Sequence, residues 1–332
     1  MTLSAFYGGL YGPGSSSSPK LGDAVSGITA SDFNTVILSL FHIGSPANCW
    51  TGSGGTKHCQ KYGDIVFNNT PDIVATDGAV QSDWVGGSGW ADDMNTLKAG
   101  GVDKIYLSFG GGSPVVDFTT IAENIMQYED PGKKTGPYIP TDSNLYENFV
   151  ALRAYLPMVD GIDLDQEEST DQSTTDAMIA FGNMAVAVGF QEVTLVPPFN
   201  FYQDCYQAAG EAINAYAAGM TPPLNGAVTR IGLQLYSGGF EYPSCMTSWA
   251  ATAQNISAAG GGQCPVLMVG ANADGESEHG IYATFNQYTT SYGAGGFIWR
   301  YDFIDSSLTC YEQAMTIGLS SGAWPPVSGE CG

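Results

Sequence analysis

Short apolar runs recur along the whole chain, and stretches of helical pattern and Gly or Pro residues separate them. Buried strands that alternate with helices predict a parallel sheet of the α/β class. At 332 residues, eight such units favour one closed (β/α)8 TIM barrel over an open doubly wound sheet. No linker divides the sequence, so we expect residues 1–332 to form a single domain. The candidate strands are Leu3–Gly8, Thr35–Phe41, Lys104–Phe109, Gly161–Gln166, Glu192–Pro197, Arg230–Tyr236, Pro265–Gly270 and Gly296–Arg300.

Helical patterns lie between these strands, and several begin at Ser, Thr or Asp and end at a glycine, as at Gly189, Gly219 and Gly260. Such residues are favoured at helix caps. The first unit is the weakest, with only a short helical candidate near Ala30–Asn34. The other candidates are Ala91–Lys98, Ser143–Tyr155, Thr174–Val188, Gln207–Ala217, Thr247–Ala259, Ile281–Tyr292 and Tyr311–Leu319.

The segment Asp160–Glu167, with the sequence DGIDLDQE, is the most informative part of the chain. In a strand, Asp163, Asp165 and Glu167 share one face, and Ile162 and Leu164 share the other. The apolar face suits packing against helices, whereas three crowded carboxylates do not suit a core. Like charges this close cannot all ionise, so we expect at least one raised pKa and a carboxyl that can act as a general acid. The alternatives are an exposed acidic strand end and a metal site.

This octapeptide resembles the catalytic signature of glycoside hydrolase family 18, the chitinase-type family, which reads Asp-Gly, apolar, Asp, apolar, Asp, any residue, Glu. The resemblance implies a catalytic (β/α)8 barrel, whose reactive groups sit at the carboxyl ends of strands. Further segments resemble the same family and occur in its order, at strand ends that would converge in a barrel. They are Ser108-Phe109-Gly110-Gly111 at the end of the third strand, Gln234-Leu235-Tyr236 at the end of the sixth, and Trp299 at the end of the eighth.

The resemblance implies a retaining hydrolysis of a β-1,4 bond next to an N-acetylhexosamine, assisted by the substrate itself. Glu167 would protonate the glycosidic oxygen and later activate water as a base. The acetamido oxygen of the substrate would attack the anomeric carbon. Asp165 would orient the acetamido N–H, Tyr236 would hydrogen-bond the acetamido oxygen, and Asp163 would share a proton with Asp165. Trp299 would stack on the sugar ring and form the floor of the pocket.

The expected site is therefore a set of catalytic residues surrounded by substrate-binding residues, and it requires no cofactor and no metal. Tyr7 and Phe41 end the first two strands, and each is as compatible with the core as with an aromatic wall of the site. The catalytic residues are Glu167, Asp165, Asp163 and Tyr236, and the substrate-binding residues are Trp299, Gln234, Tyr7, Phe41, Ser108, Gly110 and Gly111.

The interval from Gly270 to the helical candidate at Ile281 leaves no room for the small subdomain that many members of the family insert after the seventh strand. The chain thus resembles the compact plant- and fungal-type branch, and an open groove favours an endo-acting chitinase. Two alternatives stay open. The first is an endo-β-N-acetylglucosaminidase that acts on N-glycan cores, against which Trp299 argues. The second is a non-hydrolytic chitin- or glycan-binding lectin, against which the complete set of carboxylates argues.

The charge of the chain limits its partners. Ten basic and 33 acidic residues give a formal charge of −23, so nucleic acid and membrane surfaces, which need basic footprints, are poor partner candidates. No run of apolar residues is long enough for a membrane span. A neutral partner such as chitin or another N-acetylglucosamine-containing glycan is compatible, and we expect a monomer.

The chain has seven cysteines, with no C-x-x-C pair and no zinc-ligand spacing with the histidines. Disulfides in an oxidising compartment are therefore favoured, which predicts a secreted protein. The N-terminal sequence has no signal-peptide pattern, so we expect a leader to have been removed. From the order of strands around a barrel we expect the pairs Cys49–Cys59, Cys205–Cys245 and Cys310–Cys331, with Cys264 free.

Overall fold

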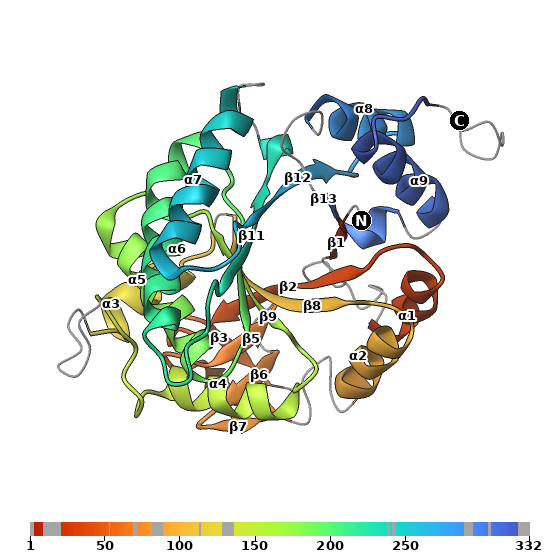
Figure 1. Cartoon of the computed structure of the whole chain (residues 1–332). Helices are drawn as coiled ribbons and strands as arrows, with labels where there is room; N and C mark the ends of the chain where they lie inside the picture. The colour runs from red at the N-terminus through yellow and green to blue at the C-terminus, as the bar shows by residue number, and fades with distance from the viewer. Residues whose placement is uncertain are drawn as a thin grey trace.

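A computed structural model describes residues 3–8, 21–52, 54–68, 72–81, 89–112, 114–127, 136–237, 240, 244–288, 295–304 and 307–324, with the backbone alone at 3–8, 23, 237 and 302. A ring of parallel strands forms its centre (Figure 1). The strands are β1 (Leu3–Gly8), β2 (Thr35–Ile43), β8 (Lys104–Gly111), β9 (Gly161–Gln166), β10 (Glu192–Leu195), β11 (Val228–Leu233), β12 (Val266–Asn272) and β13 (Gly295–Trp299).

The strand β1 closes the ring, because it pairs in parallel with β2 on one side and with β13 on the other. Each remaining strand of the ring pairs in parallel with the next one along the chain. All the predicted strands are present, with small shifts at their ends. The α/β barrel predicted from the alternation of strands and helices is therefore confirmed.

The helices lie outside the ring, and α5, α6 and α7 pack side by side on one flank while α8 and α9 cover another (Figure 1). The helices are α1 (Leu21–Thr29), α2 (Gly89–Ala99), α3 (Asp117–Asn124), α4 (Asn144–Tyr155), α5 (Gln172–Ala187), α6 (Gln203–Ala218), α7 (Ser244–Gly260), α8 (Glu278–Tyr288) and α9 (Leu308–Leu319). Short 3-10 turns span Asn200–Tyr202 (η1), Leu235–Ser237 (η2) and Tyr301–Phe303 (η3).

One predicted helix is wrong, and one helix was not predicted. The candidate near Ala30–Asn34 is a turn and a loop. The helix α1 lies earlier, where Leu21, Ala24 and Ile28 recur at helical spacing and are buried against the core. The unpredicted helix α3 is short, and its first N–H groups are capped by a side chain that is distant in the sequence, as shown below.

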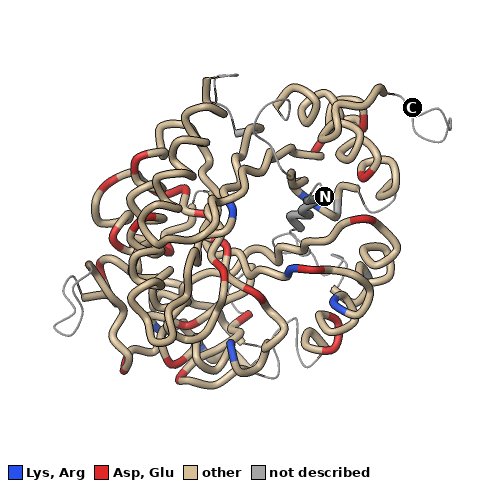
Figure 2. The backbone as a smooth tube through the Cα atoms, in the orientation of Figure 1, with Lys and Arg blue, Asp and Glu red and all other residues tan. Residues whose placement is uncertain are grey.

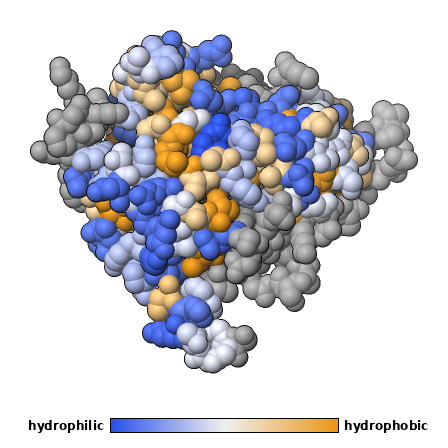
Figure 3. Space-filling view, turned by 90° about the horizontal axis from the view of Figure 1, so that it is seen from below, coloured by the Kyte–Doolittle hydropathy of each residue, from blue (hydrophilic) through white to orange (hydrophobic). Residues whose placement is uncertain are grey.

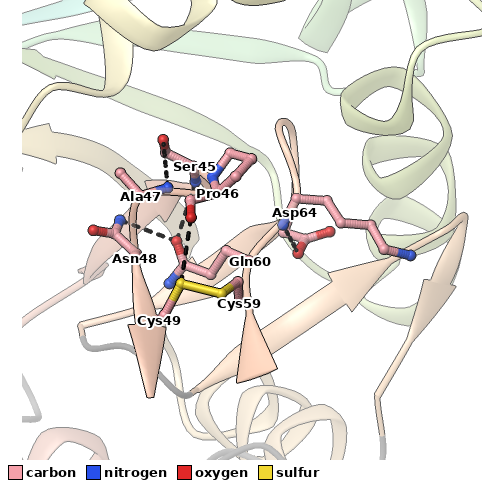
Figure 4. Close-up of a disulfide and its surroundings, with 9 residues drawn as sticks. Ser45, Pro46, Ala47, Asn48, Cys49, Cys59, Gln60 and Asp64 are labelled. Atoms are coloured by element: carbon pink, nitrogen blue, oxygen red, sulfur yellow. Dashed lines mark hydrogen bonds between the residues drawn. A yellow bond between two sulfur atoms is a disulfide. The ribbon is translucent and has the colours of Figure 1, made fainter. Parts of the chain in front are cut away.

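Between β2 and β8 the chain forms additional short strands that the pattern of apolar residues does not predict. Three strands, β5 (Ile65–Phe67), β6 (Ile73–Thr76) and β7 (Ala79–Val80), extend the sheet in antiparallel fashion from the end of β2. A separate hairpin pairs β3 (Cys49–Thr51) with β4 (Lys57–Cys59). The predicted Cys49–Cys59 disulfide closes this hairpin, with an S–S distance of 2.05 Å (Figure 4).

The hairpin is fixed to its base by Gln60. Its buried side-chain oxygen accepts hydrogen bonds of 3.1 Å from the N–H of Ser45 and of 3.1 Å from Nδ2 of Asn48 (Figure 4). The disulfide and Gln60 therefore hold the two ends of the hairpin together in the folded protein, and the disulfide also lowers the entropy of this loop in the unfolded chain.

Of the other cysteine predictions, some are confirmed and one is wrong. Cys264 is free, as predicted, and Cys310 is disulfide-bonded, while its predicted partner Cys331 lies outside the described residues. The predicted Cys205–Cys245 pair is wrong, because both thiols are free and buried. Each lies in the first turn of a different helix, and the Cys205 thiol instead donates to the carbonyl of Tyr202 at 2.9 Å.

Two hydrophobic layers hold the barrel together. Inside the ring lie Ile37, Tyr106, Val196, Met268 and Phe297. A larger layer lies between the strands and the surrounding helices and includes the aromatic cluster of Phe109, Phe149 and Phe181. Burial of these apolar surfaces supplies most of the driving force for folding.

The distribution of charged residues along the backbone reflects the acidic composition of the chain. Acidic residues are spread over the helices and loops, and basic residues are few (Figure 2). On the face seen in Figure 3, small groups of hydrophobic residues lie among hydrophilic ones. In the part of the chain that the structure describes, no helix has the length and apolarity needed to cross a bilayer.

We expect Gly110→Ala to destabilise the fold. Gly110 lies on β8 with φ of +115°, and a Cβ atom there would lie 2.1 Å from the carbonyl oxygen of Asp165. The strained backbone alone should lower the free energy of unfolding by about 1–3 kcal/mol, and the overlap should add to this. Urea unfolding of both proteins measures the difference.

The matched control is Gly54→Ala, because a Cβ at Gly54 would meet no atom within 4 Å. Its free energy of unfolding should stay within about 0.5 kcal/mol of the parent. Equal stability of the two variants would contradict the assigned role of Gly110.

Candidate active site

The strand β9 turns its acidic residues inward. Ile162 and Leu164 are fully buried in the layer between the sheet and the helices. Asp163 and Asp165 occupy the alternate positions and are also buried, at 0% and 3% exposure. Glu167, one residue beyond the end of β9, is half-buried. The alternation expected from the sequence is therefore the one that the strand adopts.

Two hydroxyl groups from neighbouring strands hold the carboxylate of Asp163. The Ser108 hydroxyl donates to Oδ2 at 2.6 Å, and the Thr194 hydroxyl donates to Oδ1. Both residues are the direct register partners of Asp163, on β8 and on β10. A buried carboxyl needs such donors, because an unpaired one would lose its hydration without compensation.

A small open hollow lies at the carboxyl end of the barrel. It brings together the acids of β9 and its end with residues from β2, β8, β11 and β13. Its lining residues are Leu40, Gly111, Gly112, Asp165, Glu167, Gln234, Tyr236 and Trp299. Of the residues predicted from the sequence, Asp165, Glu167, Gln234, Tyr236, Trp299 and Gly111 thus meet in one place.

Gln234 links the two carboxylates of the hollow. Its Nε2 donates hydrogen bonds of 2.7 Å to Oδ1 of Asp165 and of 3.0 Å to Oε1 of Glu167. Gln234 is itself buried and directly follows β11. Because an amide nitrogen carries two N–H donors, one side chain can fix the orientation of both acids.

Two tyrosines that follow β10 fix the end of the acidic strand. The Tyr202 hydroxyl donates to the carbonyl of Glu167 at 2.8 Å. The buried Tyr206 hydroxyl accepts the N–H of Gln166 at 2.9 Å. Burial, followed by the charges of nearby acids that include Glu167, raises the pKa of both phenols, so both remain protonated near neutral pH.

Tyr236 contributes a phenol side chain to the lining of the hollow. Burial, together with the charges of Asp165, Glu167 and Asp163, raises its pKa well above the usual value, so the phenol stays a hydrogen-bond donor. Its ring packs edge-on against Phe297 in the barrel interior, with centroids 6.4 Å apart. Trp299 completes the lining at the end of β13.

The predicted small residues after the third barrel strand make room for the site. Gly110 and Gly111 both have positive φ, and a Cβ at Gly111 would lie 2.6 Å from Cδ1 of Leu40. A Cβ at Gly112 would lie 3.2 Å from Oε2 of Glu167. Gly110 and Gly111 therefore favour glycine for space as well as for backbone conformation.

Phe41 and Tyr7 do not add to the described lining. Phe41 is fully buried against Phe67 and Trp90, which supports the core alternative. The register of β2 with β8 shifts between Leu38 and Phe41, and Leu40 lines the hollow instead. The backbone of Tyr7 pairs with Trp299, but its side chain lies outside the described residues.

Sequence reasoning missed a second polar cluster beside the hollow. Glu168 accepts the backbone N–H groups of Phe118 at 2.7 Å and of Thr119 at 2.9 Å, so it caps α3. Asp117 accepts the N–H of Ile43 at 2.8 Å and contacts Nδ1 of His42 at 2.9 Å. Only the presence of an additional acid after Glu167 could have indicated this cluster, since its partners are far apart in the chain.

Within the described ranges, no three His, Cys, Asp or Glu side chains are arranged to hold a metal ion.

The fold can be compared with those of known proteins. No family model and no curated protein matches the sequence. A GH18 chitinase from Pseudoalteromonas aurantia aligns over 96% of this chain and 100% of its own, with a TM-score of 0.56 and 12% identity. A chitinase from Bacteroides thetaiotaomicron aligns over 98% and 99%, with a TM-score of 0.53 and 11% identity. The chitinase-like agglutinin RobpsCRA from Robinia pseudoacacia aligns over 95% and 98%, with a TM-score of 0.52 and 11% identity.

These likenesses define the class of fold. The chain has the chitinase-type fold of glycoside hydrolase family 18, as its acidic motif indicated. At these identities the likeness extends to the fold alone.

His42 should make stability depend on pH. Burial alone would lower its pKa, but the charge and hydrogen bond of Asp117, with the charge of Glu168, outweigh burial and raise the pKa above 6.5. The stabilisation by protonated His42 is therefore complete below about pH 6.5 and is lost as pH rises through the raised value. The melting temperature of the parent should exceed that of His42→Gln most at low pH, and the difference should shrink toward about pH 8.

Thermal melts between roughly pH 5 and pH 9 measure this difference. The exposed His279 supplies the control, because His279→Gln should shift the melting temperature little at any pH. A difference between the parent and His42→Gln that grows with pH would contradict the assigned ion pair.

Proposed function

We propose that the protein is an endo-acting chitinase that hydrolyses β-1,4 bonds between N-acetylglucosamine units with retention of configuration. The observation that carries the proposal is the meeting of Asp165, Glu167, Gln234 and Tyr236 around one hollow at the carboxyl end of the barrel. A chitinase-type fold, whose active sites lie at that end, supports it.

Glu167 is the proposed acid and base. Its side chain borders the hollow, its Oε1 is oriented by Gln234, and its carbonyl is held by Tyr202. A carboxyl fixed in this way can protonate the glycosidic oxygen of a sugar chain that crosses the hollow, and afterwards take a proton from water.

The substrate supplies the nucleophile in this proposal. Its acetamido oxygen attacks the anomeric carbon, the bond to the leaving oxygen breaks, and the acetamido nitrogen takes up positive charge. Asp165, already aimed by Gln234, would accept the acetamido N–H and stabilise that charge. The protonated Tyr236 would donate to the acetamido oxygen and hold it in line.

Asp163 does not contact the substrate in this scheme and instead affects the charge of Asp165. It lies deeper in the barrel and has the hydroxyls of Ser108 and Thr194 as donors. Two acids on one face of a strand disfavour simultaneous ionisation, so we propose that Asp163 and Asp165 share a proton during the cycle.

The small subdomain that many chitinases insert after the seventh barrel strand would form one wall of the substrate groove, and its presence or absence affects the mode of cleavage. β12 ends at Asn272 and α8 begins at Glu278, so no subdomain lies between them. A groove without that wall can admit the middle of a polymer, which supports endo cleavage. A secreted location is part of the proposal and is supported by the Cys49–Cys59 disulfide.

A lectin is the second candidate, and the similar fold of a chitinase-like agglutinin favours it. Such a protein would bind chitin in the same hollow without cleaving it. The presence of Asp163, Asp165 and Glu167 together supports hydrolysis over binding alone. An endo-β-N-acetylglucosaminidase would use the same acids, and Trp299 at the hollow supports chitin over N-glycan cores.

Glu167→Gln should abolish most of the activity. The amide keeps the shape of the side chain but cannot supply the proton, so the rate should fall by about 10²–10⁴-fold. The measurement is product analysis with chitin hexamer, colloidal chitin and a high-mannose glycopeptide. The exposed Glu123 on α3 gives the control Glu123→Gln, which should keep parental rates.

The outcomes separate the three candidates. Short chitin oligomers released by the parent and by the control alone would support the chitinase. Cleavage of the glycopeptide alone would indicate N-glycan processing, and binding without cleavage would indicate a lectin. A Glu167→Gln variant with most of its activity would remove Glu167 from the role of the acid.

The stereochemistry of the product tests the mechanism independently. Attack by the acetamido oxygen followed by water gives two inversions, so the first product should be the β anomer. Rapid separation of anomers during the first turnovers measures this. An initial α anomer would mean a single displacement and would exclude participation of the acetamido group.

A further inference from the structure

A pair of aromatic rings, the half-buried Phe199 and the exposed Phe201, follows β10, at the same end of the barrel as the hollow. Phe201 is 68% exposed, the largest value among the large hydrophobic side chains in the described part of the chain. Its ring is stacked on that of Phe199, with centroids 5.3 Å apart and an interplanar angle of 7°. Most of the Phe201 side chain is therefore accessible to solvent in spite of this stacking.

The backbone beneath these rings is anchored on two sides. Oδ1 of Asn200 accepts the indole N–H of the buried Trp249 at 3.0 Å, which attaches the turn η1 to α7. The Tyr202 hydroxyl donates to the carbonyl of Glu167 at 2.8 Å, which attaches the same turn to the end of β9. The exposed ring is therefore held in place before any ligand arrives, so little conformational entropy would be lost on binding.

The same contacts make the rings continuous with the proposed catalytic site. The ring centroids of Phe201 and Tyr202 are 4.9 Å apart, and Tyr202 bonds directly to the residue whose carboxyl borders the hollow. A chain that leaves the hollow on this side would meet the Phe201 ring next. An uncharged, flat, apolar surface selects a ligand with an apolar face, and a pyranose ring has one in its axial C–H groups.

We propose that Phe199 and Phe201 form a stacking platform for a sugar residue of the polymer that lies outside the central hollow. This inference rests on the proposed function, because its ligand is the N-acetylglucosamine chain that the hollow would cleave. The platform adds affinity for long chains and takes no part in bond cleavage. Phe201 is the contact residue, and Phe199 supports it from below.

The test compares Phe201→Ala with the parent on chitotriose and chitohexaose. Loss of one stacking contact should raise KM for the hexamer by about 3- to 10-fold and leave kcat unchanged. Kinetics on the trimer should stay at parental values, because the additional sugars are the ones that reach the platform. Phe201→Trp should restore the hexamer KM, which a purely structural role would not predict.

The control is Val150→Ala on α4, another exposed hydrophobic side chain, at 47% exposure. It should match the parent on both substrates. Unchanged hexamer kinetics in Phe201→Ala would overturn the platform, and so would an equal loss on trimer and hexamer. Light scattering that finds a dimer in the parent and a monomer in Phe201→Ala would also overturn it, by assigning the rings to a second copy of the chain.

Failure of the proposed function gives a different result. If the parent cleaves neither oligomer, titration calorimetry with chitohexaose replaces the kinetics. A Kd that rises about 3- to 10-fold in Phe201→Ala would then support the platform on a lectin. An unchanged Kd, or no binding by the parent, would overturn it.

Discussion

The candidate site depends on one buried carboxylate, that of Asp163. A carboxyl in the barrel interior is tolerated only with hydrogen-bond donors, and Ser108 and Thr194 provide them from the strands on either side. Their pairing fixes the register of β8, β9 and β10 together. Because a slip by one residue would turn every side chain of a strand to the opposite face, this register also places Asp165 toward the hollow.

The two ends of the barrel interior have different chemistry. At the amino end, Arg230 lies over the ring of Tyr106 at 4.9 Å and bonds the Thr35 hydroxyl, while Lys104 pairs with Glu192. Each of these charged groups therefore has a partner inside the protein. At the carboxyl end, the amide of Gln234 is divided between two acids that border an open hollow. Among the described residues, the acids that border the hollow lie where the strands end, which agrees with the general plan of such barrels.

Local pattern predicted the strands because each one is a short apolar run between turn residues, and burial on both faces requires such runs. It also predicted the motif residues that lie at strand ends. It left the core and the wall equally open for Phe41, and the structure, where the register of β2 shifts, places Phe41 in the core and Leu40 at the hollow. It failed at Cys205 and Cys245 because disulfide pairing requires a distance and a direction that spacing along the chain does not contain.

The sequence alone determined the alternation of β9, the order of the barrel strands and the identity of the acids, since each follows from neighbours within a few residues. Only the tertiary structure decided how Gln234 joins Asp165 to Glu167, how Glu168 caps a helix formed earlier in the chain, and how Tyr202, the neighbour of Phe201, comes to bond Glu167. The physical reason is that these contacts join segments tens of residues apart. Their geometry is fixed by strand register and helix packing, which no local pattern of residues specifies.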